Sequence, residues 1–210
     1  MSHLQAFAAA FARCPLIAIL RGVRPDEIDA IGDALVDAGF EIIEVPLNSP
    51  DPLKSIERLA VRLDGRAIVG AGTVLTPDQA SDVAAAGGKI IVSPNTNPSV
   101  IARTSDLGMV SLPGCYTPTD AFAALAAGAH GLKFFPADAI GPNAIKGLRA
   151  VLPKSAPLLA VGGISVSNIA DWKTIGIDGF GLGSALYSPG AAANKVRASA
   201  RGFIEALHAC

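Results

Sequence analysis

One lysine stands in the middle of an apolar run. Lys133 belongs to HGLKFFPA (residues 130–137), which otherwise reads as a strand buried on both faces. Because burying an unpaired ammonium group is costly, this lysine must be paired, neutral or used in chemistry. Burial lowers the pKa of a lysine from about 10.4, so that more of it is a neutral amine at pH 7. A neutral amine attacks a carbonyl group to form a Schiff base, whose iminium form is an electron sink.

A carboxylate occupies a similar position in another apolar run. Glu44 lies in EIIEVPL (residues 41–47) and shares one face of the expected strand with Ile42 and Pro46. A carboxylate near a Schiff-base lysine can shuttle protons, which accelerates such reactions roughly 10²–10⁴-fold. The alternative is that Glu44 is only a buried ion-pair partner of Lys133.

Other polar residues end further apolar runs and suit anionic groups of a substrate. Arg21 ends LIAILR, and Thr73 lies in GAGTV, so that the two side chains could hold a carboxylate. Alone, the arginine could be merely exposed and the threonine structural. Gly162 and Gly163 end LLAVGG, whereas GFGLGS contributes Gly183 and Ser184. Backbone N–H groups at such positions bind phosphate, although glycines also simply permit tight turns.

The elements that must position these residues alternate regularly. Short apolar runs are separated by Ala-rich amphipathic segments that begin near proline, as in TPDQ (76–79), and often end in glycine, as in DAGF (37–40). About eight such units predict a single (β/α)8 barrel domain over residues 1–210, with an open doubly wound sheet as the alternative. In a barrel the active site lies at the carboxyl ends of the strands. The expected strands are 16–21, 41–47, 67–74, 89–94, 109–114, 131–137, 158–163 and 179–184.

Composition excludes several classes of protein. The net charge is −1 without a basic cluster, which argues against nucleic-acid binding. Three distant cysteines indicate neither disulfides nor a metal knuckle, and no apolar stretch approaches the roughly 18 residues of a membrane span. The first 14 residues predict a short amphipathic helix with Leu4, Phe7 and Phe11 on one side, and not a signal peptide, so we expect a cytoplasmic protein.

Alternative chemistries fit less well. A metal-dependent aldolase would need clustered histidine and carboxylate ligands, but His3 and His208 lie at the termini and His130 precedes a strand. A phosphosugar isomerase, or a phosphate-binding barrel without catalysis, would share the glycines without requiring both Glu44 and Lys133. The GxSxG and GxxxxGK[ST] motifs do not occur.

Several motifs together resemble one family. PLIAILRG, EVPLNSP, GAGTVL, VSPN, PGCYTPTDA, LKFFPA and VGGIS are similar, in this order, to the 2-keto-3-deoxy-6-phosphogluconate/galactonate class I aldolases, from about Pro15 to Tyr187. The resemblance implies a (β/α)8 barrel, a Schiff-base lysine at Lys133, a general acid/base at Glu44, no metal or other cofactor, and usually a homotrimer. Its substrates would be a phosphorylated sugar acid and pyruvate.

The resemblance also assigns the substrate-binding residues. Arg21 and Thr73 match positions near the pyruvyl carboxylate, and the glycines with Ser184 match the phosphate end. The gluconate branch typically has EVTLRT and PTGG, where this chain has EVPLNSP and AVGG, so Pro46, Asn48 and Val161 resemble the galactonate branch. Activity on the gluconate epimer, or on both, stays open. The expected substrate-binding residues are Arg21, Thr73, Asn48, Pro94, Val161, Gly162, Gly163, Gly183 and Ser184.

Overall fold

Strands and helices alternate along nearly the whole chain. The structure, a computed structural model, describes residues 2–209. Its strands are β1 (Leu16–Ile19), β2 (Ile42–Pro46), β3 (Ile68–Gly72), β4 (Ile90–Val92), β5 (Val110–Leu112), β6 (Gly114–Cys115), β7 (Leu132–Phe134), β8 (Leu158–Val161) and β9 (Gly179–Leu182). Its helices are α1 (His3–Arg13), α2 (Ile28–Asp37), α3 (Pro52–Arg62), α4 (Pro77–Ala85), α5 (Pro98–Asp106), α6 (Pro118–Ala126), α7 (Ala137–Ile140), α8 (Pro142–Arg149), α9 (Ile169–Thr174) and α10 (Ala193–His208).

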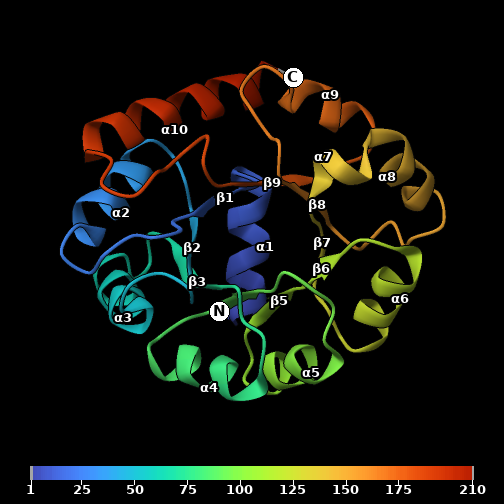
Figure 1. Cartoon of the computed structure of the whole chain (residues 1–210), viewed down its shortest axis with the longest axis horizontal. Helices are drawn as coiled ribbons and strands as arrows, with labels where there is room; N and C mark the ends of the chain where they lie inside the picture. The colour runs from blue at the N-terminus through green and yellow to red at the C-terminus, as the bar shows by residue number, and fades with distance from the viewer. Residues whose placement is uncertain (1, 210) are drawn as a thin grey trace.

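The strands form one sheet that closes into a barrel, and the helices form a ring around it (Figure 1). Neighbouring strands are parallel and follow the order β5-β4-β3-β2-β1-β9-β8-β7-β6. The segments at the two ends of this order, β5 and β6, are separated in the chain by Pro113 alone. One stretch of chain therefore joins both edges of the sheet. This confirms the expected (β/α)8 barrel and excludes the open doubly wound sheet.

The seam of the barrel uses a histidine side chain. The backbone N–H of His130 donates to the carbonyl of Ser111 at 2.9 Å, and the N–H of Ser111 donates to Nδ1 of His130 at 3.0 Å. The imidazole thus accepts the hydrogen bond from Ser111 that a carbonyl of a neighbouring strand would otherwise accept. This exchange occurs near Pro113, which interrupts the expected strand. This role requires a neutral ring, and burial lowers the pKa of His130 accordingly.

Strand side chains alternate between two apolar layers. Leu132 and Phe134 belong to the outer layer, between the strands and the helices. Lys133, which stands between them, therefore faces the interior of the barrel. Ile42 belongs to the interior layer, and Glu44 shares its face by the same alternation. The interior position of both candidate residues follows from the strand period alone.

The first helix closes the amino end of the barrel. Figure 1 shows α1 across the centre of the ring, and its buried residues Phe7 and Ala10 pack on the interior layer. Phe11 stacks on Phe7 with ring centroids 5.4 Å apart. The predicted amphipathic helix is confirmed, but Leu4 is 40% exposed and is not part of its buried face. No described helix is long and apolar enough to span a membrane.

Most predicted helix boundaries are correct. Proline is the first residue of α4, α5 and α6, and a glycine with positive φ follows each of these helices. RPDE (residues 24–27), where proline also predicts a helix start, is an exception, because residues 24–27 form a turn and α2 begins only at Ile28. There the side chain of Glu27 accepts the N–H of Arg24 at 3.0 Å, which favours a turn before the helix.

Candidate active site

A cavity of about 300 Å³ lies at the carboxyl ends of the strands. Its wall contains every predicted site residue except Asn48, so the closed barrel brings together residues that are far apart in the chain. It also contains residues that were not among the predicted site residues. These are Ile19, Phe135, Ile164, Gly181 and Ala185.

Lys133 and Glu44 are the buried charged residues of this cavity. Their relative exposures are 7% and 2%. Nζ of Lys133 lies 4.6 Å from the centre of the Phe135 ring, and Oε2 of Glu44 is buried without a hydrogen-bond partner. Within residues 2–209 no hydrogen bond joins the two side chains. The interpretation of Glu44 as merely an ion-pair partner therefore lacks the direct contact it would need.

Burial moves the pKa values of both groups toward neutrality. It lowers the pKa of Lys133 from 10.5 to about 8, although the charge of Glu44 opposes this effect. It raises the pKa of Glu44 from 4.5 to about 7, against the charges of Lys133 and Arg21. Groups with such values exchange protons readily near neutral pH, as amine catalysis and acid–base catalysis require.

Arg21 forms a cationic end of the cavity, where Asn48 and Thr73 orient it. Its Nη1 donates to Oδ1 of Asn48 at 2.5 Å, and its Nη2 lies 3.4 Å from Oγ1 of Thr73. Thr73 has a φ of 58°, which is rare for a β-branched residue and marks a constrained position. Asn48 does not line the cavity. It lies behind Arg21 and fixes the guanidinium, which remains available to an anion.

Unpaired backbone donors form another part of the wall. Gly162 and Gly163 follow β8 with φ values of 102° and 69°, a conformation that favours glycine. The N–H groups of Gly163, Ile164, Ser184 and Ala185 have no acceptor among the described residues. Backbone N–H groups arranged in this way bind phosphate oxygens.

A side-chain amide holds the loop that carries two of these donors. Nδ2 of Asn168 donates to the carbonyl of Gly163 at 2.8 Å, and its Oδ1 accepts the N–H of Ser165 at 2.9 Å. The carbonyl of Gly163 is therefore engaged by the amide. Because the N–H of Ile164 belongs to the same trans peptide, it points away from Asn168.

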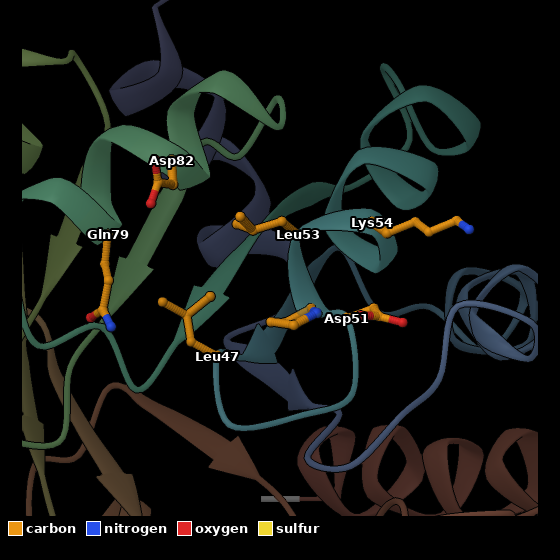
Figure 2. A pocket seen from close by; sticks show the side chains of 7 residues that line it. Leu47, Asp51, Leu53, Lys54, Gln79 and Asp82 are labelled. Atoms are coloured by element: carbon orange, nitrogen blue, oxygen red, sulfur yellow. The ribbon is translucent and has the colours of Figure 1, made fainter.

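A larger hollow lies elsewhere, between α3 and α4 (Figure 2). It has a volume of about 600 Å³, and Figure 2 shows its one lysine, Lys54, pointing away from Gln79 and Asp82. Lys54 is exposed and therefore lacks the desolvation that activates a lysine as a nucleophile. The smaller cavity in the barrel is the better candidate for chemistry. No group of three metal-binding side chains occurs in the part of the chain that the structure describes.

The overlooked residues differ in the signal they leave in the sequence. Phe135 was predictable, because it follows Lys133 by two residues and so shares its face of the strand. Ile164 and Ala185 contribute backbone N–H groups, which no residue type reveals. Asn168 acts through the geometry of a turn that only the structure displays.

Comparisons with known proteins point to one family. A family model described as KDPG and KHG aldolase matches residues 8–197. The probable 2-dehydro-3-deoxy-6-phosphogalactonate aldolase of Rhizobium meliloti (strain 1021) is 51% identical over 195 residues, which cover 93% of this chain and 92% of the relative. The 2-dehydro-3-deoxy-6-phosphogalactonate aldolase of Escherichia coli (strain K12) is 46% identical over 194 residues, which cover 92% and 95%.

Solved structures agree as well. One described as "Native KDPGal structure" has a TM-score of 0.92 and 46% identity, and the match covers 94% of this chain and 96% of that one. A cube-shaped cage designed by fusing symmetric oligomeric domains has the same score and identity and covers 94% and 73%. The chain belongs to the KDPG and KHG aldolase family.

Proposed function

We propose that this protein is a class I aldolase that reversibly cleaves 2-dehydro-3-deoxy-6-phospho-D-galactonate to pyruvate and D-glyceraldehyde 3-phosphate. The observation that carries this proposal is the burial of Lys133 and Glu44 at the same cavity. Both are buried at one cavity, and burial brings both pKa values near neutrality. The names of the two relatives support the choice of substrate.

The reaction uses the lysine as nucleophile and the glutamate as proton carrier. The neutral amine of Lys133 attacks the C2 ketone, and Glu44 supplies the proton with which the carbinolamine loses water. The resulting iminium accepts the electron pair of the C3–C4 bond while the Glu44 carboxylate takes the proton of the C4 hydroxyl. Glyceraldehyde 3-phosphate leaves, and the remaining enamine is protonated at C3 and hydrolysed to pyruvate. The iminium provides the electron sink, so the mechanism needs no metal or cofactor.

Two anion-binding ends would orient the substrate along the cavity. Arg21, oriented by Asn48 and Thr73, would bind the C1 carboxylate beside the reacting ketone. The free N–H groups around Gly163 and Ser184 would bind the phosphate. This arrangement would place C2 at Lys133 and fix the direction of the chain. Pro94 would complete the wall.

The wall near C4 favours the galactonate epimer. Val161 lines the cavity and has no hydrogen-bonding group to offer a C4 hydroxyl. A threonine at this position would add one hydroxyl, and a single unpaired polar group discriminates strongly between substrates. Activity on the gluconate epimer, or on both, is the second candidate function. A phosphate-binding barrel without aldolase activity is the third and remoter candidate function.

Steady-state kinetics with both C4 epimers test the proposal. We expect a higher kcat/KM for the galactonate epimer and no loss of activity with a metal chelator. A clear preference for the gluconate epimer would overturn the choice of substrate. Phosphate binding without cleavage of either epimer would instead favour the non-catalytic barrel.

We also propose that the single-domain chain works as a cytoplasmic homotrimer. Large apolar side chains that follow the strands or lie on outer helices are substantially exposed in the single chain, which suits burial against other copies. Leu53, Leu75, Tyr116 and Phe122 are among them. The related cage, built from symmetric oligomeric domains, supports self-association. Light scattering should give three times the chain mass of 21.3 kDa, whereas the mass of one chain would contradict the trimer.

A further inference from the structure

Strand β3 presents two glycines to the interior of the barrel. Ile68 belongs to the interior layer, so Gly70 and Gly72 share its inward face by the strand period. In the register between β2 and β3, Glu44 pairs with Gly70 and Pro46 pairs with Gly72. The inward face of β3 therefore has no side chain beside Glu44.

The carboxylate of Glu44 occupies the place of a side chain at Gly72. A Cβ atom added to Gly72 would lie 2.1 Å from Oε2 of Glu44 and 2.4 Å from its Oε1. Such distances are far below van der Waals contact. The backbone does not itself demand glycine here, because Gly72 is absent from the positive-φ glycines of the described chain. The position of the carboxylate is thus the structural reason for glycine at this site.

Gly70 provides a contrast within the same strand. A Cβ atom there would lie 1.9 Å from the backbone carbonyl oxygen of Ile90 on β4. The obstacle at Gly70 is the backbone of a neighbouring strand, so glycine at this position allows the two strands to pack in the barrel. The obstacle at Gly72 is the carboxylate end of one flexible side chain, so glycine at this position leaves space for Glu44.

We propose that Gly72 is a positioning residue for Glu44, because the missing side chain leaves the space in which the carboxylate lies beside the cavity. Oε2 of Glu44 has no hydrogen-bond partner, and a hydrogen bond from the backbone of Gly72 partly offsets the rise in the pKa of Glu44, so the bare backbone of Gly72 sets the place of the carboxylate. This inference rests on the proposed role of Glu44 as proton carrier. Displacing a catalytic group by about 1 Å can cost on the order of 10²-fold in rate.

The variant Gly72→Ala tests the inference. The added methyl group should displace the flexible carboxylate and not the barrel, so the protein should fold. We expect kcat for cleavage, and the exchange of the C3 protons of pyruvate with deuterium measured by NMR, to fall on the order of 10²-fold. Borohydride trapping with pyruvate should still reach completion, because Lys133 does not move. Gly147→Ala is the matched control, since no atom lies within 4 Å of a Cβ added on α8.

A double variant separates positioning from a general structural role. In Glu44→Ala there is no carboxylate to displace, so adding Gly72→Ala should cause no further loss of activity. An equal loss in both backgrounds, or full activity of Gly72→Ala, would overturn the inference. Full activity of Glu44→Ala alone would instead refute the proposed role of Glu44. If Gly72→Ala is unstable, the double variant should recover stability, and a double variant that is equally unstable would contradict the inference.

Discussion

Lys133 and Glu44 lie on β7 and β2, which are separated in the sheet by β8, β9 and β1, yet both face one cavity without a hydrogen bond between them. Burial disfavours the charged form of each group, whereas the charge of each favours ionisation of the other. The pKa of Lys133, about 8, and the pKa of Glu44, about 7, are the balance of these effects. This balance keeps an amine nucleophile and a proton carrier available at the same pH.

The rate at which Lys133 forms an imine should depend on pH with a lowered midpoint. Only the neutral amine attacks a ketone, so the rate should rise with pH through about 8, the pKa of Lys133. Trapping with pyruvate and cyanoborohydride between about pH 6 and 9.5 would measure this profile. A rate that still rises steeply toward pH 10.5, where an ordinary lysine titrates, would show that burial does not activate Lys133.

Replacing Glu44 by glutamine should lower activity and raise stability at alkaline pH. The pKa of Glu44 is raised from 4.5 to about 7, so its ionisation destabilises the fold fully above pH 7 and not at all below pH 4.5. Glu44→Gln should therefore be more stable than the natural protein at pH 8, on the order of 1–2 kcal/mol. The difference in Tm should shrink as the pH falls toward 4.5. Activity should fall roughly 10²–10⁴-fold. A Tm difference that does not change with pH would contradict the assigned pKa.

Replacing Asn168 by alanine should weaken binding of the phosphate group specifically. Without the amide, the Gly163 carbonyl is free to turn toward the anion, and the donor loop loses two hydrogen bonds. We expect KM for the phosphorylated substrate to rise about 10-fold or more, while kcat/KM for the dephosphorylated substrate stays unchanged. Ser167→Ala is the control, because Ser167 bonds only the side chain of Ser165. Equal losses for both substrates would indicate a general structural role.

Replacing Val161 by threonine should shift the preference between epimers. Val161 lines the cavity, so we expect the added hydroxyl to pair with the C4 hydroxyl of the gluconate epimer. The ratio of kcat/KM for the galactonate epimer to that for the gluconate epimer should fall about 10-fold. If this ratio stays the same in Val161→Thr, residue 161 does not determine the preference between the epimers.

Much of the fold was predictable because local rules and the global structure agree. Proline at helix starts, glycine at helix ends and continuous apolar runs predict the alternation of elements, and the strand period places Lys133 in the interior. The division of one strand into β5 and β6 depends on how Pro113 meets the seam. The contact between the Glu44 carboxylate and Gly72 depends on the register between two strands. The hydrogen bond from Arg21 to Asn48 depends on how two loops meet. No pattern within a single segment encodes such relationships.

Identification of the lysine that forms the imine decides whether Lys133 is the nucleophile. The protein would be incubated with pyruvate and borohydride, digested and mapped by mass spectrometry, with Lys133→Met as the matched variant. We expect a reduced pyruvate adduct on Lys133 in the natural protein, and neither adduct nor cleavage activity in the variant. An adduct on another lysine, or cleavage activity that survives in Lys133→Met, would show that Lys133 is not the nucleophile.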